Sequence, residues 1–185
     1  MANDAYLIAV LTAVIRVLHE QRADFALAGG LAYSALVTPR ATVDIDVLIF
    51  IPTRPPTKLF ESFRLVLPVF RPHDQPMVFR RATIWRAIGG EPGREVVLDF
   101  ILAETEFHRS ALARKRTVTF AGMALPIVAI EDLVLLKALA GRAQDRADIE
   151  GVLAGAGIRL DREYLDQWAR RLGVDLAPPG RSESS

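Results

Sequence analysis

Two aspartates interrupt an otherwise apolar, β-rich run between residues 43 and 51, and this conflict constrains the chain more than any other feature. The run predicts a buried strand, in which charged side chains are depleted. Asp44 and Asp46 lie two positions apart, so their side chains point to one face of the strand, roughly 6–7 Å apart along the chain. Two carboxylates at this spacing repel each other and are costly to bury, which favours a cation between them. The alternative is that both cap a strand end and face water.

A third carboxylate, Asp99, lies in another apolar segment, residues 96–101. Alone it indicates little, but together with Asp44 and Asp46 it supplies a ligand from a second strand. Mg²⁺ prefers oxygen ligands and is often held by a few carboxylates plus substrate phosphates. Two metal ions about 4 Å apart clamp the attacking and leaving oxygens of a phosphoryl displacement. We therefore predict that Asp44, Asp46 and Asp99 are catalytic and metal-binding, with two Mg²⁺ ions, or Mn²⁺ in their place.

A diglycine, Gly29-Gly30, follows the short apolar run 25–28 and precedes a segment of helical composition. The start of a helix offers unpaired backbone N–H groups and a positive dipole end, and glycine lets a phosphate approach closely. A diglycine alone usually marks only a turn. In combination with the three aspartates it predicts a nucleotide-binding turn.

The composition is typical of a globular protein, and the net charge is too close to zero to indicate the class of binding partner. The chain has 185 residues, 51% of them apolar, which suits one compact domain or a domain with a small helical appendage. It contains no cysteine, and its formal net charge is +1, too small to indicate a nucleic-acid partner. Arginine outnumbers lysine, which suits phosphate binding or reflects a GC-rich genome. No leader peptide or spanning segment is recognisable, so we expect a cytoplasmic protein without a membrane partner.

The hydrophobic patterns predict alternating helices and strands, then a helical C-terminal part. The expected helices cover residues 5–19, 31–36, 57–67, 104–113, 130–140, 144–154 and 161–172. The expected strands cover residues 25–28, 43–51, 77–88, 95–102, 117–120 and 124–128, with residues 89–93 as a hairpin connection. We predict an α+β (two-layer α/β) fold, a mixed sheet flanked by helices. A catalytic core at 1–128, a helical part at 129–176 and a disordered tail at 177–185 complete the organisation.

The diglycine and the acidic pair together resemble the nucleotidyltransferase superfamily, whose fold is shared with DNA polymerase beta. Its signature is Gly-Gly or Gly-Ser, a spacer, then Asp-x-Asp or Asp-x-Glu in a strand; here thirteen residues separate Gly30 from Asp44. The resemblance implies that Gly29 and Gly30 hold the β- and γ-phosphates of a nucleoside triphosphate. It also implies that Asp44 and Asp46 bind the metals, while Asp99 completes a metal site and helps to deprotonate the acceptor hydroxyl.

A narrower resemblance rests on residues 40–46, which look like the Arg-x-Thr-x-Asp-hydrophobic-Asp form of AbiEii-like bacterial nucleotidyltransferases, many of them toxins of toxin–antitoxin pairs. Residues 130–137 and 141–149 are similar to that group's downstream motifs, except that Gln144 stands where a lysine is usual. The resemblance implies nucleotide-binding roles for Arg40, Thr42 and Lys137, and a cognate antitoxin as a partner.

Several of these residues have structural alternatives. Arg40 suits a phosphate contact or a solvated loop, and Lys137 suits a phosphate contact or a side chain that extends to the surface. For the acids near Arg142 a structural role is favoured, with Asp145 or Asp148 capping a helix or pairing with the arginine. The histidines lack ligand spacing, and the tryptophans and Tyr164 are expected in the core. Tyr33 is the exception, because it lies one turn after Gly30, near the predicted nucleotide site.

The function predicted from these features is transfer of a nucleoside monophosphate from a nucleoside triphosphate to an acceptor hydroxyl. RNA such as a tRNA end, a protein side chain and a small molecule such as an antibiotic are the open alternatives for the acceptor. A hydrolase using the same carboxylates, or a non-catalytic nucleotide- or partner-binding module on the same fold, are the alternatives.

Overall fold

The computed structural model describes residues 2–53, 55–79, 81–155 and 157–176. The chain divides into two compact units, residues 1–129 and 130–185, here called the sheet unit and the helical unit. The predicted tail at 177–185 lies outside the described residues. No helix over the described residues combines the length and the apolar character that crossing a membrane requires.

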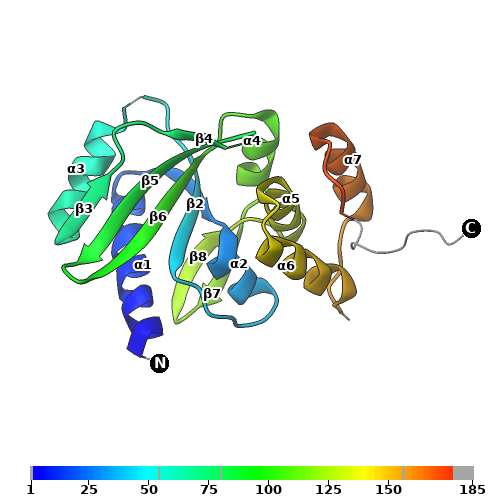
Figure 1. The fold of residues 1–185 in the computed structure, drawn as a ribbon, viewed down its shortest axis with the longest axis horizontal. Coiled ribbons are helices and arrows are strands. Elements are labelled where there is room, and N and C mark those ends of the chain that lie inside the picture. Colours follow the sequence, from blue (N-terminus) through cyan, green and yellow to red (C-terminus); the bar gives the residue numbers. More distant parts are fainter. Residues whose placement is uncertain (1, 54, 80, 156, 177–185) are drawn as a thin grey trace, which may run out of the picture. The chain divides into compact units, whose positions relative to one another are not determined.

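The sheet unit contains one mixed, eight-stranded sheet in the order β3-β5-β6-β2-β1-β8-β7, with β4 paired to β5 (Figure 1). Its strands are β1 (Asp24–Leu27), β2 (Asp44–Phe50), β3 (Val69–Pro72), β4 (Met77–Phe79), β5 (Ala82–Glu91), β6 (Arg94–Leu102), β7 (Arg116–Phe120) and β8 (Met123–Ile127). Its helices are α1 (Ala2–Glu20), α2 (Gly29–Leu36), α3 (Thr57–Val66) and α4 (Glu106–Ala113). Strand β2 runs parallel to β6, and β1 runs parallel to β8. The predicted fold class, a mixed sheet flanked by helices, is confirmed.

Helix α3 covers one face of the sheet with aromatic side chains. The ring of Phe60 lies 5.4 Å from that of Trp85 on β5 and 6.4 Å from that of Phe100 on β6. Consecutive residues of a strand point to opposite faces. Arg86 and Asp99, which adjoin Trp85 and Phe100, therefore point to the face that α3 does not cover.

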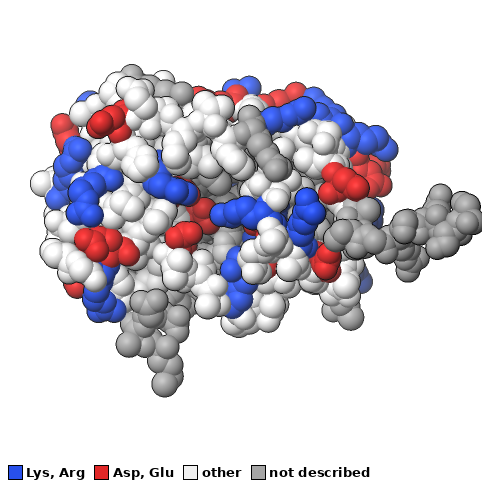
Figure 2. Space-filling view, viewed as in Figure 1, with Lys and Arg blue, Asp and Glu red and all other residues white. Residues whose placement is uncertain are grey.

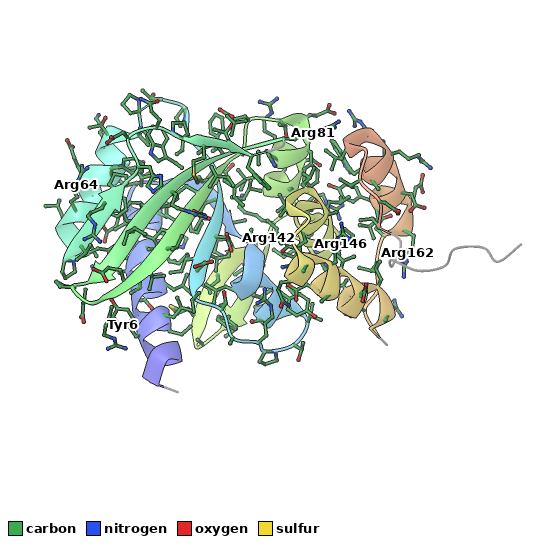
Figure 3. All side chains as sticks on the ribbon, in the orientation of Figure 1. Tyr6, Arg64, Arg81, Arg142, Arg146 and Arg162 are labelled. Carbon is green, nitrogen blue, oxygen red and sulfur yellow. The ribbon has the colours of Figure 1, made fainter. Side chains whose placement is uncertain are left out.

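The hairpin that joins β5 to β6 is tighter than predicted. Strand β5 continues through the two glycines to Glu91, which pairs with Arg94, so the expected five-residue connection at 89–93 was wrong. Pro92 and Gly93 make the turn, and Gly93 has the left-handed φ of +79° that the second central position of a type II turn requires. The tip is held by Tyr6 of α1, labelled in Figure 3, whose hydroxyl accepts a 2.7 Å hydrogen bond from the Glu91 N–H.

Two other strand predictions need correction. The expected strand at 77–88 is two strands, β4 and β5, which pair antiparallel with each other. Strand β3, which pairs with the far half of β5, was not predicted, because a four-residue segment ending in proline carries a weak strand signal.

The helical unit consists, in its described part, of α5 (Ile130–Ala140), α6 (Ala143–Ala154) and α7 (Arg162–Leu172). These bounds agree with the predicted helices to within one residue. Asp161 caps α7 by accepting a hydrogen bond from the Tyr164 N–H, and Gly173 ends it with a left-handed φ of +63°. The Tyr164 hydroxyl donates to Asp132 at 2.6 Å, which joins α7 to α5.

Candidate active site

The carboxylates predicted to act together lie in one row across the sheet. In the parallel pairing of β2 with β6, Asp46 stands directly opposite Asp99, while Asp44 stands opposite Val97. In the antiparallel pairing of β6 with β5, Asp99 stands opposite Arg86. Residues in direct register point to the same face, with neighbouring strands about 4.8 Å apart. Asp46, Asp99 and Arg86 therefore form a row, here called the charged row, and Asp44 adjoins it along β2.

The charged row lies on a half-buried face between apolar side chains. Asp99 is 7% exposed, whereas Asp44 and Asp46 are half-buried. On β5 the residues two before and two after Arg86 are Ile84 and Ile88, which point to the same face and are also half-buried. The low-dielectric surroundings strengthen the electrostatic interactions within the row.

The diglycine lies against Asp46. The N–H of Ala28 donates to the backbone oxygen of Asp46 at 2.9 Å, which extends the pairing of β1 with β2 to the start of α2. Gly29 has a φ of +59°, and a Cβ atom there would lie 1.8 Å from Asp46 Oδ2. Only glycine satisfies both conditions, because other residues meet a steric penalty at this φ and would collide with the carboxylate. The close approach places the N-terminus of α2 beside the acidic pair.

Gly30 lies against the loop that carries Arg40 and Thr42. A Cβ atom on Gly30 would lie 2.6 Å from Thr42 Oγ1 and 3.1 Å from Arg40 Nη2. The loop is fixed to α2 by Ser34, whose hydroxyl donates to the backbone oxygen of Arg40 at 3.2 Å. The Arg40 guanidinium lies 5.6 Å from the ring centroid of Tyr33. The structure thus brings Gly29, Gly30, Arg40 and Thr42 together at one end of β2, next to Asp44 and Asp46.

Arg86 is a member of the site that the sequence analysis did not identify. Its Nε donates to Asp99 Oδ1 at 2.7 Å, and its Nη2 donates to Asp99 Oδ2 at 2.6 Å, a bidentate pair. The hydrogen bonds to Asp99 raise the pKa of Arg86, desolvation opposes this, and the charges of Asp99, Asp44 and Asp46 add to the increase. All three carboxylates therefore act on the same guanidinium.

The side chains of β2 suit a hard divalent cation, but the third acid is already engaged. Asp44 and Asp46 offer carboxylate oxygens on one face, which is the donor set that Mg²⁺ and Mn²⁺ prefer. Both oxygens of Asp99 accept hydrogen bonds from Arg86. Over the described residues, no group of three or more His, Cys, Asp or Glu side chains is arranged to hold a metal ion. The donor set fits a divalent ion at Asp44 and Asp46. Asp99 can be a further ligand only if its oxygens contact the ion and Arg86 at the same time.

In the helical unit, Lys137 is 3% exposed and donates to Asp148 at 2.6 Å and to Asp145 at 3.4 Å. The alternative that its side chain extends to the surface was therefore wrong. Its ammonium is held by two buried carboxylates, and the phosphate contact stays a prediction.

The acids near Arg142 have the structural role that the sequence analysis favoured. Asp145 accepts from the Arg142 backbone N–H at 3.3 Å and from its Nε at 2.7 Å, at the start of α6 (Figure 3). Gln144, in the first turn of α6, donates to Asp148 at 3.0 Å. Its amide thus contacts the same carboxylate as Lys137.

His108 is a buried histidine whose pKa is lowered by its surroundings. It lies in the first turn of α4 at 1% exposure, where burial lowers its pKa to about 4 against a smaller opposing effect of the Leu102 backbone. The neutral imidazole is therefore packed as a core side chain.

No protein-family model and no curated protein sequence matches this chain, whereas solved structures do. A protein from Thermotoga maritima assigned as a nucleotidyltransferase matches with a TM-score of 0.55 at 14% identity, over 89% of this chain and 93% of its own. An antigenic nucleotidyltransferase-like protein from Paracoccidioides brasiliensis matches with a TM-score of 0.56 at 22% identity, over 80% and 74%. This chain has the nucleotidyltransferase fold.

The fold also occurs in the antibiotic-resistance factor ANT(2″)-Ia, which was solved with adenylyl-2″-tobramycin. That structure matches with a TM-score of 0.50 at 15% identity, over 90% of this chain and 86% of its own. At such low identities the likeness concerns the backbone arrangement, so the chemistry of this chain has to be argued from its own residues.

Proposed function

We propose that this chain is a metal-dependent nucleotidyltransferase, which transfers a nucleoside monophosphate from a nucleoside triphosphate to an acceptor hydroxyl. The observation that carries the proposal is the contact between the diglycine and the acidic pair. Gly29 has no room for a Cβ atom because the carboxylate of Asp46 lies against it. A phosphate held at the helix start would therefore lie next to carboxylates suited to a divalent cation.

The start of α2 supplies the phosphate-binding groups in this proposal. Ala28 occupies the N-cap position and has no polar side chain to accept hydrogen bonds from the first amides of the helix, and the first turn contains no acidic residue. The amides and the helix dipole favour an anion there. Arg40 and Thr42, which lie against Gly30, add a guanidinium and a hydroxyl within reach of the same space.

Asp44 and Asp46 would hold a divalent cation, and a second ion is part of the proposal if Asp99 shares its oxygens. When bound, Mg²⁺ or Mn²⁺ supplies charge neutralisation at the phosphates and lowers the pKa of an attacking oxygen. The contribution of the protein is to hold the triphosphate at the diglycine in line with the acceptor and to limit access of water.

The reaction balances as follows. The acceptor oxygen forms a bond to the α-phosphorus, and the bond from the α-phosphorus to the oxygen that bridges to the β-phosphorus breaks. Pyrophosphate leaves with that bonding pair, and the proton of the hydroxyl passes to a carboxylate of the site. We assign this role to Asp99, which stands opposite Asp46 and whose two oxygens each keep a lone pair beside the bond from Arg86.

The proposal is tested with Asp46→Asn and with Asp74→Asn, an exposed aspartate outside the site, as the matched control. We expect Mg²⁺-dependent transfer of label from an α-labelled triphosphate to be abolished in Asp46→Asn and unchanged in Asp74→Asn. The two variants should melt at similar temperatures. Retained transfer in Asp46→Asn would refute the assignment. Triphosphate binding without turnover would favour the non-catalytic module, and monophosphate release without an acceptor would favour the hydrolase.

The acceptor is proposed as RNA or protein on the narrower AbiEii-like resemblance, with a small molecule as the second candidate because ANT(2″)-Ia was solved with an adenylylated antibiotic. In Figure 2, Lys and Arg side chains lie interspersed with Asp and Glu side chains on the visible face, in keeping with the formal net charge of +1. Bulk charge therefore does not single out RNA. Parallel assays with total RNA, cell protein and aminoglycosides separate the three acceptors.

On the same AbiEii-like resemblance we propose that the chain acts as the toxin of a toxin–antitoxin pair, and this role has a test of its own. Expression of the wild-type chain should arrest growth, and expression of Asp46→Asn should not. Relief of the arrest by the product of a neighbouring gene would identify an antitoxin. Normal growth during expression of a form that is active in transfer would argue against the toxin role and leave the transferase proposal intact.

A further inference from the structure

We propose that Arg86 is the permanent counter-charge of the charged row, a positioning residue that fixes Asp99 and keeps the acidic pair from binding a divalent cation tightly without a triphosphate. The inference rests on the proposed function. It goes further by assigning a role to a residue that neither the aspartate motif nor the comparisons identify.

The first step is the geometry of the pair. Arg86 and Asp99 are direct cross-strand partners, and two short hydrogen bonds, at 2.7 and 2.6 Å, join them. A bidentate pair of this kind fixes the plane of the carboxylate as well as its position. Since the Asp99 side chain is only 10% exposed, few rotamers are open to it once the pair has formed. Arg86 therefore determines where the oxygens of Asp99 lie with respect to Asp46.

The second step is charge. Asp44, Asp46 and Asp99 together carry a formal charge of minus three, which the guanidinium reduces to minus two. Arg86 and Asp46 are separated by two strand spacings, roughly 10 Å. At that range a unit positive charge measurably weakens the binding of a divalent cation, because the half-buried face is incompletely screened by water. A triphosphate brings further negative charge and restores the attraction, so metal and nucleotide binding become coupled.

The third step is the exposure of the guanidinium, which contacts a buried carboxylate but is itself partly accessible to solvent. The Arg86 side chain is 39% exposed, although its carboxylate partner is buried. Three of its five N–H donors remain after the two bonds to Asp99 are counted. The guanidinium can therefore stay bound to Asp99 while facing a negatively charged substrate. A lysine at this position would keep the charge but not the fork.

The experiment measures Mn²⁺ binding by electron paramagnetic resonance, without nucleotide and with a non-hydrolysable triphosphate. Four forms are compared: wild type, Arg86→Gln, Arg86→Lys and Arg71→Gln. Arg71 on β3 is the matched control, because it pairs with Glu95 on β6 across the intervening strand β5, but its side chain is 61% exposed and not part of the charged row. Thermal melting of each form identifies any variant that fails to fold.

Without nucleotide, we expect Arg86→Gln to bind Mn²⁺ about five- to tenfold more tightly than the wild type, because one unit charge has been removed. Arg71→Gln and Arg86→Lys should stay within twofold of the wild type. The enhancement of Mn²⁺ binding by the triphosphate should shrink in Arg86→Gln. A purely structural role of Arg86 would not tighten metal binding. Transfer activity should fall in both Arg86 variants, since both lose the bidentate fork.

Failure of this inference differs from failure of the proposed function. If Asp46→Asn binds Mn²⁺ as the wild type does, the metal site itself is wrong, and with it the transferase proposal. If Asp46→Asn loses Mn²⁺ binding but Arg86→Gln binds no more tightly than Arg71→Gln, only the counter-charge role of Arg86 is overturned. If Arg86→Gln does not fold, an Arg86→Lys form that binds Mn²⁺ more than fivefold tighter than the wild type overturns it as well.

Discussion

Replacing Gly29 by alanine tests the arrangement on which the proposed function depends. The backbone of Gly29 is left-handed, with a φ of +59°, and an added Cβ atom would lie 1.8 Å from Asp46 Oδ2. The backbone conformation alone costs alanine about 1 kcal/mol relative to glycine. The collision with Asp46 comes on top of this and is relieved only if the carboxylate or the start of α2 moves. Since both belong to the proposed site, the second effect should appear in ligand binding.

Gly93→Ala separates the two effects. Gly93 also has a left-handed φ, +79°, but an added Cβ atom there meets nothing within 4 Å. Both variants should lose about 1 kcal/mol of unfolding free energy from the backbone, or roughly 2–4 °C in melting temperature for a chain of this size. Only Gly29→Ala should weaken Mg²⁺-dependent triphosphate binding in calorimetry, by about tenfold or more, because displacement by about 1 Å is enough to disrupt such a site. If both variants bind the triphosphate equally well, the diglycine is a turn and nothing more.

Three further predictions follow from the described contacts. Burial lowers the pKa of His108 in the folded protein to about 4, whereas in the unfolded chain this histidine binds its proton near pH 6.5. Between pH 6.5 and pH 4 the unfolded chain therefore binds more protons than the folded one. The free energy of unfolding should drop over this range by at most about 3 kcal/mol. Urea unfolding of His108→Gln should lack this drop and that of His73→Gln should keep it; equal pH profiles would contradict the assignment. Lys137→Met should lose about 3–5 kcal/mol by leaving Asp148 uncompensated, and a double variant with Asp148→Asn should regain part of the loss; additive losses would argue against the buried pair. Arg40→Ala should weaken triphosphate binding about tenfold in calorimetry without a comparable loss of stability, and unchanged affinity would remove it from the phosphate site.

Local sequence signals were sufficient for the parts of the site that lie close together in the chain. The helix that begins at the diglycine and the alternation that puts Asp44 and Asp46 on one face both depend on a few consecutive residues. The parallel pairing of β2 with β6 joins residues about fifty positions apart, and no local pattern specifies its register. The sequence therefore predicts that Asp99 belongs with the pair, but not that it stands opposite Asp46.

The sequence analysis did not identify Arg86, and the hairpin connection that it expected would not have brought this residue opposite Asp99. A connection at 89–93 would pair Ile88 with Arg94 and place Thr83 opposite Asp99. The actual two-residue turn at Pro92 and Gly93 shifts the pairing and brings Arg86 opposite Asp99. The signal was present: Pro-Gly is a strong turn dipeptide, and an arginine in an apolar strand calls for an acidic partner on the next one.

The charged row conflicts with the rest of the sheet, and this conflict is the strongest physical argument for a ligand. Arg86 is bound to Asp99 by two hydrogen bonds, and the formal charge around β2 still remains negative. A sheet selected for stability alone would carry apolar side chains at these positions, as it does at Ile84 and Ile88 beside the row. Departures from local consistency persist in natural proteins where function compensates for them. A divalent cation together with a triphosphate compensates in this way, because the cation offsets the carboxylates and the triphosphate gives the guanidinium and the start of α2 an anion to bind. Binding of both should therefore raise the melting temperature of the wild type more than either alone.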